Sequence, residues 1–168
     1  ADVRELADKW LRQRAVEDFL GELERFYRNH EGFVRTRMVP VYAALGEGIR
    51  EVAAEEVGWD PAPTPDWEAF VAAYLDAMVS RWVGSSKGQL RAVTIQAQVL
   101  GEDVYEAIRQ RLQEWVDRRP GKFAMWESVQ AAGAFSKATY AEAGVTKVKW
   151  VNFNPSCPYC QSLHGKVV

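Results

Sequence analysis

The sequence predicts a mainly α-helical protein: an elongated multi-helix domain that ends in a small β-hairpin carrying a Cys-x-x-Cys loop. Two observations predict this class. Apolar residues recur at intervals of three and four residues over most of the first 144 positions, which is the spacing of amphipathic helices. The final stretch, residues 145–168, is the part that alternates as a strand does, and it holds both cysteines.

Residues 1–58 are expected to form an N-terminal helical arm. An apolar stripe predicts one amphipathic helix over residues 3–29, and a second helical stretch is expected over residues 33–57. Pro40 lies inside the second stretch and removes a backbone hydrogen bond, so we expect a kink or a division there. Residues 59–65 contain three prolines and are predicted to be a stiff, extended linker.

A helical domain is expected over residues 66–144. Thr64 is predicted to cap its first helix, with Pro65 as the first helical residue. The segment Gly84-Ser-Ser-Lys-Gly88 has a glycine at each end and predicts a break. Residues 90–100 fit a strand or a helix, and we favour the helix.

Two further helices complete this domain. One is predicted over residues 102–118, with the basic pair Arg118-Arg119 at its negative end and Pro120-Gly121 as its stop signal. The last helix is predicted over residues 122–143, and Gly144 is expected to be its C-terminal cap.

The terminal hairpin is the part of the sequence with candidate chemistry. Residues 146–153 alternate as a strand, Asn154-Pro155 breaks it, and Cys157-Pro-Tyr-Cys160 forms a tight loop before a second short apolar run. Two thiolates at this spacing bind one zinc ion from one loop, and His164 adds a third candidate ligand. The remaining ligands would come from beyond Val168 or from another subunit.

Two other interpretations of the cysteine pair stay open. Cys-Pro-Tyr-Cys is identical to the glutaredoxin active-site tetrapeptide, but too few residues follow Cys160 to build the sheet that such a redox site needs. The pair could also be two plain thiols, or a disulfide that fixes the loop. His30 and His164 are the only histidines, and no hydrolase or metalloprotease motif is present, so we expect no catalysis.

Composition and charge limit the class of partner. The first 80 residues hold 16 acidic and 9 basic side chains, whereas residues 81–168 hold 7 acidic and 12 basic. This asymmetry suits subunits stacked end to end or a protein with a basic inner face, but it does not reach the basic surplus of a dedicated nucleic-acid binder.

Seven tryptophans suggest that a partner covers some aromatic surface, although filling gaps between helices explains them equally well. No apolar run is long enough for a membrane span, and two cysteines fit a reducing compartment.

The last quarter of the sequence contains four distinctive pieces: Tyr140-Ala-Glu-Ala-Gly-Val145, Trp150, Cys157-Pro-Tyr-Cys160 and Leu163-His-Gly-Lys-Val167. With these pieces, residues 122–168 resemble the head-morphogenesis, or minor head, proteins of tailed bacteriophages, the Mu protein F-like group. The sequence keeps Glu127 of the family's Arg-Thr-Glu, and we expect this side chain to make a structural contact to Lys147 or Lys149. It has Gly133 where the family has Asn, and Asn154 and His164 where the family has Asp.

The resemblance implies a non-catalytic role in head assembly. It implies association with portal and capsid proteins, a place inside the virion head near the portal, and the host cytoplasm as the site of assembly. Contact with packaged DNA would not be base-specific, and the chain could form a homo-oligomer. The alternative is a zinc- or thiol-dependent module of an enzyme or of a toxin-like effector, because such hairpins can be joined to catalytic segments.

Overall fold

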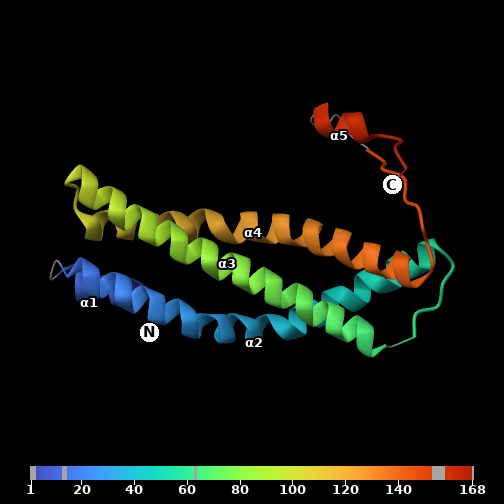
Figure 1. Cartoon of the computed structure of the whole chain (residues 1–168), viewed down its shortest axis with the longest axis horizontal. Coiled ribbons are helices and arrows are strands. Elements are labelled where there is room, and N and C mark those ends of the chain that lie inside the picture. The colour runs from blue at the N-terminus through green and yellow to red at the C-terminus, as the bar shows by residue number, and fades with distance from the viewer. Residues whose placement is uncertain (1–2, 13–14, 63, 153–157, 168) are drawn as a thin grey trace. The chain divides into compact units, whose positions relative to one another are not determined.

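The computed structural model describes residues 3–12, 15–62, 64–152 and 158–167. Its elements are α1 (Val3–Leu11), α2 (Val16–Glu56), α3 (Pro65–Leu100), α4 (Val104–Glu142) and α5 (Pro158–Leu163) (Figure 1). The helices α2, α3 and α4 contain 41, 36 and 39 residues. At about 1.5 Å per residue, each is roughly 55 to 60 Å long. The mainly helical class is confirmed.

The chain packs as two compact units. The first unit is Ala1–Leu45 with Pro63–Gln130, and the second unit is Gly46–Ala62 with Ala131–Val168. The helices α2 and α4 each contribute to both units, whereas α1 and α3 belong to the first and α5 to the second. No helix within the described residues has the length and hydropathy that crossing a membrane requires.

The N-terminal arm is not one helix over residues 3–29, as the periodicity predicted. The helix α1 ends at Leu11, and α2 begins at Val16. An unbroken helix would hold Val3 about 35 Å from Phe26, yet both side chains line one cavity. The helix α1 therefore folds back along α2, and it buries Val3, Ala7 and Leu11.

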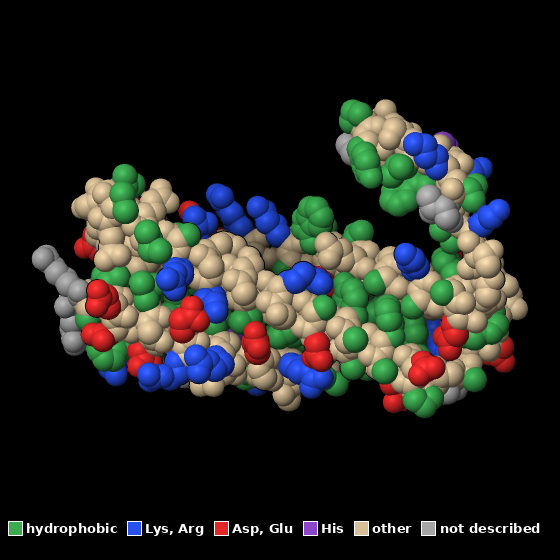
Figure 2. All heavy atoms as spheres, in the orientation of Figure 1, with side chains coloured by type: hydrophobic (Ala, Val, Ile, Leu, Met, Phe, Trp, Pro, Cys, Tyr) green, Lys and Arg blue, Asp and Glu red, His purple; other side chains and the backbone are tan. Residues whose placement is uncertain are grey.

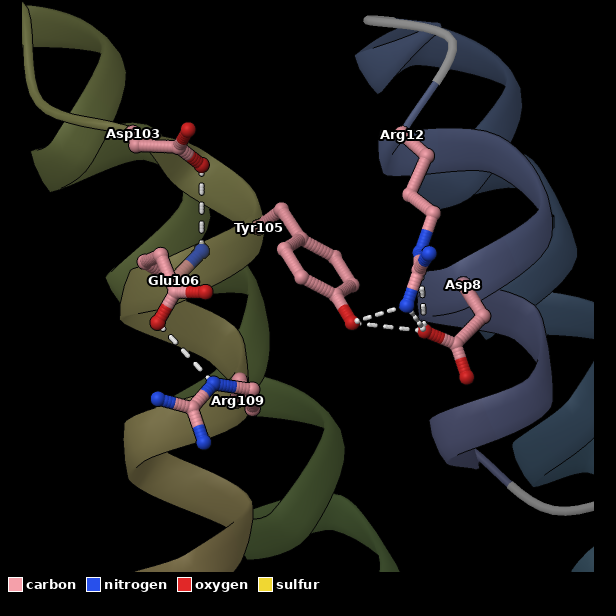
Figure 3. Close-up of polar contacts among 6 residues, drawn as sticks. All are labelled: Asp8, Arg12, Asp103, Tyr105, Glu106 and Arg109. Carbon is pink, nitrogen blue, oxygen red and sulfur yellow. Dashed lines mark hydrogen bonds and ion pairs between the residues drawn. The ribbon is translucent and has the colours of Figure 1, made fainter.

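Polar contacts fasten α1 to the start of α4 (Figure 3). The Tyr105 hydroxyl donates to the Asp8 carboxylate at 2.7 Å and accepts from the Arg12 guanidinium at 3.0 Å. The hydrogen bond from Tyr105 is the main reason that the pKa of Asp8 is lowered. The Asp103 carboxylate accepts from the backbone N–H of Glu106 at 3.1 Å, which satisfies one free donor in the first turn of α4.

The helix α3 runs through the predicted break at residues 84–88, so that prediction is wrong. Its buried side chains recur at intervals of four, four and three residues: Leu75, Val79, Val83, Ser86, Leu90, Thr94 and Ala97. Eleven residues in three turns is close to the period of a straight helix. The glycines Gly84 and Gly88 are exposed, and each costs up to about 1 kcal/mol. The buried stripe on either side of them keeps the helix intact.

The start of α3 is confirmed as predicted, but the stop signal in α4 is not. Thr64 is the N-cap of α3, and its hydroxyl oxygen accepts from the Trp67 backbone N–H at 3.2 Å. Pro120 lies inside α4, which continues to Glu142. Contacts to α3 hold α4 on both sides of Pro120, namely Arg119 with Ser86 and Glu127 with Tyr74. The predicted helix over residues 90–100 is confirmed, and α2 is not divided at Pro40.

The second unit is built around a buried arginine. Arg50 of α2 is 1% exposed, and its guanidinium donates to both carboxylate oxygens of Glu142 at 3.0 and 2.9 Å. It also donates to the carbonyl of Ala62 at 3.0 Å and lies 5.6 Å from the ring centre of Trp59. The end of α2, the turn after it and the end of α4 are thus joined by one side chain.

The predicted β-hairpin over residues 145–168 is wrong. Among residues 145–152 and 158–167, the only β pairing is an isolated antiparallel bridge between Lys149 and Val167. Where the loop tip was expected, residues 158–163 form α5, because Pro158 suits the first turn of a helix. Gly144 does end α4 as predicted, with φ 79°. Within the described residues there is no sheet for the alternating residues after Gly144 to join, so their pattern did not produce a strand there.

Candidate functional site

The predicted metal site falls on α5 and on the residues before it. Cys157 lies outside the residues that the structure describes. Cys160 is half-buried within α5, and His164 follows that helix in a turn. Within the described parts of the chain, no group of three His, Cys, Asp or Glu side chains gathers as a metal site would require. The zinc site therefore stays a prediction.

His164 has a structural task in this arrangement. Its Nδ1 accepts a hydrogen bond from the backbone N–H of Asn152 at 3.1 Å. A neutral imidazole that accepts at Nδ1 carries its proton on Nε2, so neither nitrogen offers a lone pair to a metal ion. Zinc binding at His164 would require this hydrogen bond to break. The bond also joins α5 to the segment after α4, next to the bridge of Lys149 with Val167.

A second candidate site is an apolar surface on α4. Met125, Trp126 and Val129 are 63%, 64% and 69% exposed. They lie one turn apart on one side of the helix, because residues three and four apart are neighbours. We call these three residues the α4 patch. Figure 2 shows hydrophobic side chains among charged ones on the visible surface of the protein.

Basic side chains continue the line of the α4 patch. Arg118 and Lys122 precede Trp126 by two turns and one turn, and both are exposed. Among the described residues, neither has a carboxylate within ion-pair distance. An apolar centre with unpaired cations beside it favours a partner protein whose binding surface is both apolar and acidic.

The opposite side of this segment is fixed to α3 by a half-buried polar cluster. The Tyr74 hydroxyl donates to the Glu127 carboxylate at 2.8 Å, and the rings of Tyr74 and Tyr42 lie 5.8 Å apart. Burial, with the hydrogen bond to Glu127, raises the pKa of Tyr74 to about 12. Burial also raises the pKa of Tyr42. Glu127 was expected to make a structural contact to Lys147 or Lys149; the contact observed is to Tyr74.

One pattern in the sequence indicates the α4 patch. Met125-Trp126 and Val129 do not belong to the four-residue series Trp115, Arg119, Phe123, Glu127 that faces α3, so they lie outside its core stripe. The four-residue series is continuous only if α4 continues through Pro120, and the predicted helix end at Pro120 separated Arg119 from Phe123.

Comparisons with known proteins give no relatives for this chain. No protein-family model, no curated protein and no solved structure matches it significantly.

Proposed function

We propose that the chain is a structural subunit of a tailed-phage or prophage head, a minor head protein that docks on the portal and inner capsid during assembly and performs no catalysis. The observation that carries the proposal is the α4 patch. It lies in the segment, residues 122–168, whose sequence resembles head-morphogenesis proteins. Exposed large apolar side chains gathered on one helix face mark a surface that a partner covers.

The chemistry of the patch fits docking better than ligand turnover. Trp and Met are enriched at the centres of protein interfaces, and a buried Trp is often a dominant contributor to binding. The flanking Arg118 and Lys122 would steer an acidic partner and fix its register. The Tyr74–Glu127 hydrogen bond holds this part of α4 against α3, so the patch is presented by a rigid element.

The test uses the portal protein that we expect to be encoded beside this chain. We expect the two proteins to co-purify when they are co-expressed, and Trp126→Ser to weaken the complex about 30-fold, the loss typical of a Trp at an interface centre. Raising the salt concentration should weaken it further, because Arg118 and Lys122 act electrostatically.

Val99→Ser is the matched control. Val99 is 79% exposed but lies on α3, so its replacement should leave the complex unchanged. The proposal is wrong if no portal gene lies beside this one, if the two proteins do not associate, or if Trp126→Ser binds as tightly as the wild type. Turnover of a substrate that disappears in Cys157→Ser would favour a thiol-dependent module instead.

A further inference from the structure

The first unit contains a cavity between its helices that the docking role does not use. Its volume is about 610 Å³, and α1, α2, α3 and α4 all contribute to its lining. The walls are mainly apolar and aromatic, with Phe26 and His30 from α2, Trp82 from α3, and Trp115, Arg119 and Phe123 from α4. Pockets of about 300 to 1,000 Å³ between the helices of a bundle are typical of small-molecule sites.

Two charged side chains line this cavity, the exposed Arg4 of α1 and the half-buried Arg119 of α4, and Arg119 lies among the aromatic rings. The carbon of its guanidinium lies 3.9 Å from the ring centre of Trp115 and 5.4 Å from that of Trp82. One guanidinium nitrogen donates to the Ser86 hydroxyl at 2.8 Å. Ser86 in turn donates to the carbonyl of Trp82 at 2.8 Å, so α3 holds the guanidinium in place from two points.

The cation of Arg119 has no counter-charge in the parts of the chain that the structure describes. Other half-buried or buried cations that join two helices pair with carboxylates, as Arg50 does with Glu142 and Lys87 with Glu24. Arg119 instead has two indole rings and one hydroxyl, and it keeps further N–H donors. Burial lowers the pKa of Arg119, yet a guanidinium stays charged at neutral pH.

We propose that this cavity binds a small organic anion, a carboxylate on an aliphatic or aromatic body, with the carboxylate on Arg119 and the body among the rings of Phe26, Trp82 and Phe123. A guanidinium pairs with a carboxylate through two parallel hydrogen bonds, and the contacts with the Trp115 ring and the Ser86 hydroxyl hold the Arg119 guanidinium in place at the cavity. A neutral ligand would fill the apolar space but leave the cation uncompensated. The site shares no residue with the α4 patch.

The experiment measures binding of decanoate and of its neutral analogue decanamide to the whole chain by titration calorimetry, below the concentration at which decanoate forms micelles. We expect decanoate to bind with one-to-one stoichiometry and at least tenfold more tightly than decanamide. In Arg119→Met, an apolar side chain of similar length replaces the charged one. The variant should therefore lose the preference for decanoate over decanamide and bind decanamide as the wild type does.

Arg118→Met is the matched control, since Arg118 is the neighbouring arginine on α4 but is exposed. It should bind decanoate as the wild type does. Circular dichroism checks that each variant is folded. The comparison of acid and amide on the wild type stands even if Arg119→Met does not fold. Absence of decanoate binding, equal affinity for acid and amide, or an unchanged preference in folded Arg119→Met would each overturn the proposal.

Discussion

Replacing Glu142 by Gln removes the counter-charge of the arginine at the centre of the second unit. The side chain of Arg50 is 2% exposed and that of Glu142 is 30% exposed, at an N–O distance of 2.9 Å. Glutamine has nearly the same shape and keeps one oxygen that can accept from Arg50, so packing changes little. The variant therefore isolates the effect of the missing negative charge on a cation that water cannot reach.

The size of the effect follows from these exposures. Removing one partner of a fully buried ion pair costs about 3 to 5 kcal/mol, whereas an exposed pair is worth about 0 to 1 kcal/mol. Glu142 retains some access to water, and Arg50 keeps its hydrogen bond to the carbonyl of Ala62. We therefore expect the free energy of unfolding to fall by about 2 to 3 kcal/mol. With a urea slope of about 2 kcal/mol per molar, the unfolding midpoint falls by about 1 M or slightly more.

The assay is urea unfolding followed by circular dichroism, with a double-mutant cycle. In an Arg50→Met background, Glu142→Gln should cost less than about 0.5 kcal/mol, because the cation is gone. Glu106→Gln is the control on the same helix: its partner Arg109 lies at 2.9 Å, but the two side chains are 54% and 63% exposed. It should cost less than about 0.5 kcal/mol. Equal losses for Glu142→Gln in both backgrounds would refute the reasoning.

Three other variants or titrations test the first unit. In an absorbance titration of the six tyrosines, Tyr42 and Tyr74 should stay protonated at about pH 11 in the folded protein, and all six should ionise together near pH 10 in urea. Because the pKa of Tyr74 is raised to about 12 on folding, the stability it contributes is present below pH 10 and is lost as pH rises through 12; simultaneous ionisation in the folded protein would contradict this. Thr64→Ala should cost about 1 kcal/mol and Thr64→Ser little, since serine keeps the cap; urea midpoints that do not separate them would reject the cap. Tyr105→Phe removes the hydroxyl that joins Asp8 to α4, so hydrogen exchange in α1 should accelerate several-fold, and unchanged exchange would show that α1 is held by its apolar residues alone.

The helices were predictable where a local signal determined the outcome. Thr64 and Pro65 define a start by backbone chemistry that needs no partner, and Gly144 defines an end by its left-handed conformation. The predictions that were wrong concern residues whose local preference was overruled by packing. Pro120 costs roughly 3 kcal/mol in a helix interior, but the contacts of Arg119 and Glu127 to α3 hold α4 together across it.

The terminal segment shows the converse case. Residues 146–152 alternate as a strand should, yet a strand needs a neighbour to take its backbone hydrogen bonds, and the described part of this segment forms one bridge to Val167. The periodicity of a strand predicts which face a side chain would take in a sheet, but it does not supply the sheet. The sequence placed the candidate metal ligands on this segment, and of these the structure describes Cys160 and His164.

Charged and polar residues at core-facing positions are the signal that sequence reasoning overlooked. Along α4, Trp115, Arg119, Phe123 and Glu127 follow one another at four-residue steps, so Arg119 and Glu127 occupy places where apolar side chains would ordinarily pack. The predicted helix over residues 102–118 had Arg118-Arg119 at its negative end, where no core position was expected for Arg119. Because α4 is continuous, Arg119 lies on the side of the helix that faces the other helices. A charged side chain in such a position needs either a partner within the protein or a bound ligand. Glu127 finds Tyr74, whereas Arg119 faces a cavity lined by aromatic rings. Glu127 and Arg119 thus lie on the same side of α4 but differ in role: Glu127 stabilises the fold, whereas Arg119 can bind a ligand.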